Sequence, residues 1–156
     1  MYTSIIDYLE KTTVLYSKKN AVVDGKEQYT FDELTERAKK VAAGIIDIVG
    51  EARNVPVAVY LDKSKETVVA DMGVSYSSCF FMNLDIKTPE DRIKAILEHI
   101  EPKAIIVDKN TSKRMEEILR GVNCNISILL LENAKERDIC SEEERNIYNR
   151  LEMQID

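Results

Sequence analysis

The chain has 156 residues, of which 44% are hydrophobic and 32% are charged, with five glycines and three prolines. This length and composition are typical of one globular domain and exclude disordered and fibrous classes. The net charge of -6 disfavours a surface for nucleic acid or for an anionic membrane, so we expect neither partner.

Targeting and redox features favour a cytoplasmic protein. No apolar stretch approaches the ~18 residues of a membrane span. The first fifteen residues lack a basic start and interrupt their apolar positions with charges, unlike a secretory signal. The cysteines Cys79, Cys124 and Cys140 are widely spaced, and a single histidine accompanies them, so we expect a reducing compartment and no structural zinc.

The amino-terminal part predicts a helix and then a hairpin. Ser4 can cap a helix that places Ile5, Ile6, Leu9 and Val14 on one side. Residues 21–23 and 28–31 are typical of two short strands. The Asp24-Gly25 pair between them tolerates the positive φ angles of a tight turn.

A second, longer helix is expected to begin near Thr30. The Thr30 hydroxyl and the Glu33 carboxylate have the spacing of a capping box, in which each side chain accepts a hydrogen bond from a free backbone N–H. Apolar residues then recur at helical spacing and predict one buried stripe that ends near Gly50. These are Leu34, Ala38, Val41, Ala42, Ile45 and Val49.

From residue 55 onward, apolar runs alternate with amphipathic helices. After the second run, Thr88 can cap a helix with Pro89 as its first residue, and after the third, Thr111 or Ser112 begins a helix that Gly121 ends. Runs that are apolar on both faces predict a parallel sheet covered on both sides. The fold class is therefore a doubly wound α/β domain. The runs are 55–61, 79–84, 104–107 and 126–131.

The segment 132–156 is polar and is interpreted as a connecting segment. Ser141 with Glu144 can begin a short helix, which would carry Ile147, Tyr148 and Leu151. No strand follows this helix and no stop signal ends it. We therefore expect the end of the sequence to be a boundary inside a longer chain.

Residues that could support chemistry each have a simpler structural explanation. The glycines cannot form a dinucleotide fingerprint or a P-loop. His99 is best explained as a surface residue near a helix end, with a catalytic role as the alternative. Asp62, Asp85 and Asp108 each follow a predicted strand, where they favour turns and caps. The alternative is an acidic magnesium site at the carboxyl edge of the sheet. The cysteines are expected to pack in the interior.

Two ordered motifs resemble those of adenylate-forming ligases, especially amino-acid adenylation domains of nonribosomal peptide synthetases and D-alanine carrier-protein ligases. Residues 29–34 are similar to L-[TS]-Y-x-E-L. Residues 75–85 correspond to L-K-A-G-x-A-Y-V-P-x-D, and 89–93 to the P-x-x-R-I helix start. The resemblance extends from Tyr2 to Leu131. The chain departs from the second motif at Ser77 and Ser78, in place of A-G, and at Asn83, in place of proline.

The resemblance implies an ATP-dependent enzyme that forms an acyl- or aminoacyl-adenylate and passes it to a thiol. The family's phosphate-binding loop, [TS]-[SG]-G-[ST]-T-G-x-P-K-G, is absent from the sequence and would be expected soon after Asp156. We therefore interpret residues 1–131 as an amino-terminal α/β subdomain and 132–156 as a connection cut before that loop. No catalytic, cofactor-binding or metal-binding residue is expected here, and this part alone should be inactive.

The same resemblance implies partners outside this sequence. They are the remainder of the adenylation domain, ATP with magnesium, and a carrier protein or coenzyme A as acceptor. Two other hypotheses remain open. The chain could be a free-standing receiver- or flavodoxin-like signalling module, or a partner-binding domain that docks through its polar tail.

Overall fold

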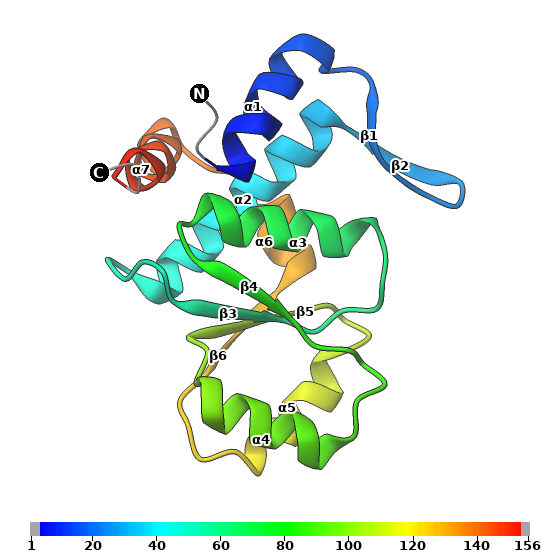
Figure 1. Ribbon diagram of the computed structural model, residues 1–156, viewed down its shortest axis with the longest axis vertical. Helices are drawn as coiled ribbons and strands as arrows, with labels where there is room; N and C mark the ends of the chain where they lie inside the picture. Colours follow the sequence, from blue (N-terminus) through cyan, green and yellow to red (C-terminus); the bar gives the residue numbers. More distant parts are fainter. Residues whose placement is uncertain (1–3, 154–156) are drawn as a thin grey trace.

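A four-stranded parallel sheet lies between two layers of helices in the computed structural model, which describes residues 4–153 (Figure 1). A helix and an antiparallel hairpin precede the sheet. The chain runs through α1 (Ile5–Tyr16), β1 (Asn20–Asp24), β2 (Glu27–Thr30), α2 (Phe31–Val49), β3 (Pro56–Val59), α3 (Lys65–Tyr76), β4 (Phe80–Asn83), α4 (Glu90–Ile100), β5 (Ala104–Val107), α5 (Ser112–Arg120), β6 (Ser127–Leu130), α6 (Leu131–Glu136) and α7 (Ser141–Glu152).

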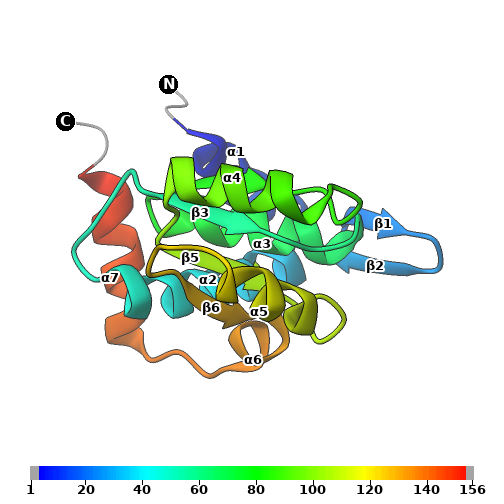
Figure 2. The same cartoon turned by 90° about the horizontal axis from the view of Figure 1, so that it is seen from below.

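The strand order is β4-β3-β5-β6, with all neighbours parallel. Helices α2, α3 and α6 cover one face, and α4 and α5 cover the other (Figures 1 and 2). The direction of winding reverses between β3 and β5, as in doubly wound folds. The predicted fold class is confirmed, including the helix and hairpin that come first. None of the helices within residues 4–153 combines the length and apolar character needed to cross a membrane.

The core forms one cluster on each face of the sheet because successive strand residues point to opposite sides. Val57 and Val59 contact the cluster under α2 and α3, whereas Ala58 belongs to the cluster under α4 and α5. All four residues of β5 are buried. The central strands are therefore apolar on both faces, as predicted.

Local signals position the first helices as expected. The Ser4 hydroxyl accepts a hydrogen bond from the Asp7 N–H at 3.2 Å. At α2, Glu33 accepts from the Thr30 N–H at 2.8 Å, and the Thr30 hydroxyl accepts from the Glu33 N–H at 3.3 Å. The predicted capping box is confirmed. The first of these two bonds also holds the pKa of Glu33 below its ordinary value.

Helix α2 packs closely against α3 at a glycine. A Cβ atom at Gly73 would lie 2.6 Å from Cγ1 of Val41, and 3.1 Å from the carbonyl oxygen of Ala38. A contact of 2.6 Å between two carbon atoms is too short to occur without a shift of one of them. The absence of a side chain at position 73 therefore sets the distance between the two helices.

Several boundaries differ from the sequence predictions. Val14 is 82% exposed and Ile5 is also exposed, so the apolar side of α1 contains Ile6 and Leu9. Pro89 is the N-cap of α4 and not its first residue, and Thr88 makes no capping bond to it. Helix α6 was not predicted, because its six residues follow β6 directly and carry no cap signal.

The last helix begins at Ser141, so its N-cap lies one residue before the predicted cap. Cys140 is the N-cap, and the Glu143 carboxylate accepts from its N–H at 2.8 Å, so Ser141 and Glu144 do not form the pair that we expected. Ile147 is buried, Leu151 is partly buried and Tyr148 is exposed. Most of the segment after β6 is thus helical, in α6 and α7, and both helices pack on α2. The ends of the proposed 1–131 and 132–156 division, residues 1–3 and 154–156, lie outside the described residues.

The departure from the second motif at Ser78 has a conformational consequence. Ser78 adopts a φ of 62°, in the left-handed region, at the position where the motif has glycine. The residue is fully buried, and its hydroxyl is among the buried polar atoms without a hydrogen-bond partner. The motif glycine is therefore explained by backbone geometry, which this chain retains with a serine.

Replacing Ser78 by glycine should raise the free energy of unfolding by about 0.5–1 kcal/mol. The substitution relieves a left-handed non-glycine residue, which costs about 1–2 kcal/mol, and glycine returns part of this gain through the entropy of the unfolded chain. Urea unfolding followed by circular dichroism would measure the change. The matched control is Ser75→Gly inside α3, which should destabilise by about 0.5 kcal/mol. Destabilisation by Ser78→Gly would contradict the strain.

Candidate functional site

The three aspartates that follow strands β3, β4 and β5 bind the backbone of their own loops. Asp62 accepts from the Lys63 N–H, and Asp85 accepts from the Lys87 N–H, both at 2.9 Å. Asp108 accepts from the N–H groups of residues 110 and 111, also at 2.9 Å. The turn and cap interpretation of these residues is confirmed.

The carboxyl edge of the sheet brings two of these aspartates together. Asp62 and Asp85 line a hollow of about 280 Å³ between the loops after β3 and β4, and Asp108 lies outside its lining. Within residues 4–153, no group of three His, Cys, Asp or Glu side chains is placed to hold a metal ion. The three aspartates are therefore not gathered into one acidic group at this edge.

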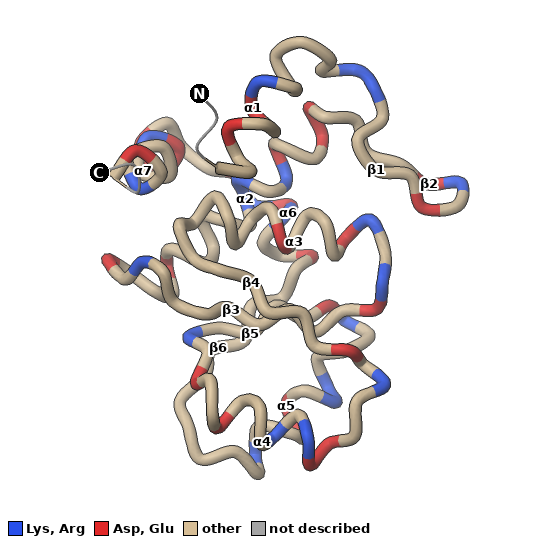
Figure 3. Tube along the Cα trace, viewed as in Figure 1, with Lys and Arg blue, Asp and Glu red and all other residues tan. Residues whose placement is uncertain are grey.

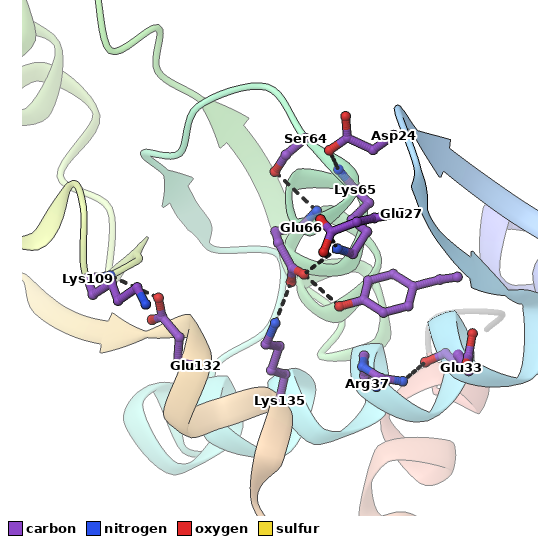
Figure 4. A network of polar contacts seen from close by, with 11 residues as sticks. Asp24, Glu27, Glu33, Arg37, Ser64, Lys65, Glu66, Lys109, Glu132 and Lys135 are labelled. Atoms are coloured by element: carbon purple, nitrogen blue, oxygen red, sulfur yellow. Dashed lines mark hydrogen bonds and ion pairs between the residues drawn. The ribbon is translucent and has the colours of Figure 1, made fainter.

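A polar network lies along the same edge and joins the hairpin, α3 and α6 (Figure 4). We call it the Glu66 network. The Tyr29 hydroxyl donates to Oε1 of Glu66 at 2.6 Å, and Nζ of Lys135 lies 3.0 Å from Oε2. Lys65 pairs with Glu27 at 2.7 Å. Both oxygens of Glu66, in the first turn of α3, thus bind groups from distant parts of the chain.

Tyr29 is the buried member of the Glu66 network. Burial raises its pKa, and the neighbouring Glu66 carboxylate raises it further, so the hydroxyl stays a donor throughout the neutral range. The Arg37 guanidinium lies 4.6 Å from the centre of the ring, and Nζ of Lys65 lies 5.1 Å from it. Two cations over one ring stabilise this position by cation–π attraction.

Two further bonds continue the Glu66 network along the edge. Asp24 of the hairpin accepts from the Lys65 N–H at 3.1 Å, and Glu132 of α6 accepts from the Lys109 N–H at 3.0 Å (Figure 4). These contacts connect the start of α3 to the hairpin, and the loop after β5 to α6. Each of these carboxylates has a structural partner on at least one oxygen, and no residue of the Glu66 network is placed as a nucleophile beside a general base.

A second polar cluster joins the helices α1, α2, α3 and α7. The Tyr76 hydroxyl donates to Glu10 of α1, and Nζ of Lys39 lies 3.1 Å from the same carboxylate. Lys39 also donates to the Tyr148 hydroxyl of α7. Burial raises the pKa of Tyr76, and the Glu10 carboxylate raises it further. The cluster adjoins an open groove of about 1000 Å³ between α1, α2 and residues 138–144.

Arg150 attaches α7 to the opposite, amino-terminal edge of the sheet. Only 3% of the residue is exposed. Its guanidinium donates to the carbonyl oxygens of Ser77 at 3.1 Å, Gly50 at 2.7 Å and Ala52. A buried charge is tolerated when its donors are satisfied, and here main-chain acceptors from two loops satisfy them.

The remaining predicted residues are positioned as follows. His99 is exposed in the last turn of α4, which agrees with the surface interpretation. Cys79 is buried, Cys124 is partly buried and Cys140 is exposed, so the packing expectation is wrong for Cys140. All three are free thiols. Burial raises the pKa of Cys124, and the carboxylates of residues 101 and 98 raise it further.

Replacing Tyr29 by phenylalanine should lower the free energy of unfolding by about 1–2 kcal/mol. The change removes a hydrogen bond to a charged acceptor and leaves Glu66 partly unpaired, in a partly solvated position. Urea unfolding followed by circular dichroism would measure the loss. Tyr16→Phe is the control, because Tyr16 is half-exposed and the mutant keeps the ring under Lys19. Equal losses in the two variants would argue against the network.

Replacing Arg150 by methionine should cost about 3 kcal/mol or more, because buried carbonyl groups of two loops lose their donor. Hydrogen exchange should also accelerate throughout α7. Arg145→Met is the matched control, since Arg145 is exposed on the same helix. A similar loss of stability in both variants would show that helix composition, and not the buried guanidinium, accounts for the effect.

Comparisons with known proteins agree on one family. A family model described as "AMP-binding enzyme" matches residues 9–153. The nonribosomal peptide synthetase ungA of Aspergillus violaceofuscus is 27% identical over 115 residues, which are 74% of this chain and 1% of that protein. A medium/long-chain-fatty-acid and 3-oxocholest-4-en-26-oate CoA ligase of Mycolicibacterium smegmatis is 24% identical over 138 residues, which are 88% and 25% of the two chains.

Solved structures agree on the fold. A benzoate CoA ligase from Burkholderia xenovorans LB400 superposes with a TM-score of 0.74 over 86% of this chain and 28% of that chain, at 18% identity. The sequence therefore spans a quarter or less of these two curated relatives and under a third of this solved structure.

Proposed function

The chain belongs to the AMP-binding enzyme family, and on this basis we propose that it is the amino-terminal part of an ATP-dependent, carboxylate-activating ligase. Such a ligase forms an acyl- or aminoacyl-adenylate and passes it to a thiol. The family match over residues 9–153 carries the proposal. The relatives include a peptide synthetase and a CoA ligase, so a carrier protein and coenzyme A are the two acceptor classes that we propose.

Within that ligase, this part has an architectural role. The carboxylates of the Glu66 network have internal partners, and within residues 4–153 no group of three His, Cys, Asp or Glu side chains is placed to hold a metal ion. Adenylate formation builds charge on the phosphates of ATP. Backbone N–H donors, a lysine and magnesium are needed around that charge to stabilise it. We therefore assign ATP and magnesium binding to the remainder of the ligase. No chemical step is assigned to residues 1–156.

The proposal also divides the chain into two parts with different roles. Residues 1–131 form an α/β subdomain, and 132–156 connect it to the phosphate-binding part. Within this connection, α6 and α7 pack on α2, so the connecting segment is helical and attached to the subdomain. The remainder of the same adenylation domain is the proposed partner, and the cytoplasm is the proposed location.

One observation favours a second candidate, a flavodoxin- or receiver-like module. The order β4-β3-β5-β6 is the order 2-1-3-4 of flavodoxin-like sheets. Strand order alone does not distinguish the two functions, because many activities share this fold. The family match across the hairpin, the sheet and α7 favours the ligase.

ATP–pyrophosphate exchange tests the proposed function. The complete product of the gene should exchange labelled pyrophosphate into ATP in the presence of its acid, and residues 1–156 alone should exchange at background rate. The control is the complete product with alanine at the lysine of its T-G-x-P-K-G loop. Exchange by residues 1–156 at the rate of the complete product would overturn the architectural role, and a gene without that loop would overturn the ligase.

A further inference from the structure

Helices α1 and α7 both pack on α2 and α3, more than on each other. An open groove of about 1000 Å³ lies between α1 and residues 138–144, which lead into α7. The apolar attachment of α1 is small, because its buried side chains are Ile6 and Leu9, whereas Val14 and Leu15 are 82% and 71% exposed. Polar contacts beside the groove therefore matter for how firmly α1 is held.

Lys39 of α2 binds both of these outer helices. Its Nζ lies 3.1 Å from Oε1 of Glu10 on α1, and it donates to the hydroxyl of Tyr148 on α7. Nζ also lies 4.9 Å from the centre of the Tyr148 ring. Only 12% of the Lys39 side chain is exposed. Figure 3 shows basic and acidic positions close together where α1 packs on α2. One shielded ammonium is thus the shared partner of α1 and α7.

The charge of Lys39 depends on both partners together. Burial alone would lower the pKa of Lys39, but the hydrogen bond to Tyr148 and the Glu10 carboxylate raise it above its ordinary value. An ammonium that is mostly shielded from water is costly when it is left unpaired.

Movement of either helix therefore affects the other. If α1 moves away, Lys39 loses its carboxylate, and we expect it to turn to solvent and release Tyr148. If α7 moves away, Lys39 is exposed to water, which weakens its attraction to Glu10.

We infer that Lys39 couples the docking of α1 to the docking of α7, so that each helix is held more firmly while the other is in place. Such a coupling is reciprocal, because one free energy describes the effect of α1 on α7 and of α7 on α1. A consequence follows that rests on the proposed function, in which α7 belongs to the connection toward the phosphate-binding part. The amino-terminal helix then regulates how firmly that connection is attached.

Amide hydrogen exchange of the 156-residue chain tests the coupling. Glu10→Gln keeps an acceptor for the Tyr76 hydroxyl but removes the charge opposite Lys39. We expect the amides of α7 to exchange about five- to tenfold faster in this variant, although the substitution lies on α1. In the reverse direction, Tyr148→Phe should accelerate exchange of the α1 amides. Circular dichroism would verify that both variants fold.

Two controls distinguish this coupling from a general loss of charge or packing. Glu36→Gln removes a carboxylate that pairs with Lys40 at 3.2 Å and lines the same groove, and it should leave exchange of α7 unchanged. In a Lys39→Met background, neither Glu10→Gln nor Tyr148→Phe should alter exchange of the opposite helix.

Three results would overturn the inference. The first is unchanged exchange of α7 in Glu10→Gln. The second is an equal acceleration in the Lys39→Met background, which would assign the effect to Tyr76 and α3. The third is an acceleration by Glu36→Gln, which would assign it to the charge of the groove as a whole. None of these measurements involves ATP–pyrophosphate exchange, so their failure would leave the proposed ligase function untouched.

Discussion

The close approach of α2 and α3 is the constraint on which the rest of the structure depends. It requires a residue without a side chain at Gly73, because the side chain of Val41 occupies that space. Helix α2 then lies near enough to the sheet to be buried along most of its length, and α1, α6 and α7 pack around it. An element surrounded on so many sides has to be apolar over a wide arc, which explains its unusual run of small and aliphatic residues.

Polar contacts then determine how the outer elements attach to this centre. The Glu66 network joins the hairpin and α6 at the carboxyl edge, and Arg150 joins α7 at the amino edge. Hydrophobic burial does not fix the direction of a contact, whereas bonds to the two oxygens of one carboxylate do. The apolar core thus provides most of the stability, and the Glu66 network and the Arg150 contacts define the orientation of the attached helices.

Features that depend on neighbouring residues could be predicted from the sequence. The Thr30–Glu33 capping box, the hairpin turn at Gly25 and the alternation of apolar runs with helices are examples. The Glu66 network could not, because Tyr29 and Lys135 are far apart in the chain and only the fold brings them together. Arg150 had no signal either, since an arginine in a polar helix usually lies in solvent. The aspartates after the strands were interpreted correctly because their hydrogen bonds are local.

The hydrogen bonds of Arg150 constrain the amino-acid type at 150 more than the amino-acid types of their acceptors. Its acceptors are carbonyl oxygens at positions 50, 52 and 77, and nearly every amino acid offers the same oxygen. Apart from Gly50, whose φ of 59° favours glycine, the acceptor positions can therefore vary in evolution without loosening α7, provided that their backbone path is kept. The arginine itself has no equivalent substitute, because only a planar guanidinium can reach all three oxygens at once. Substitutions are therefore tolerated better at the acceptor positions than at Arg150.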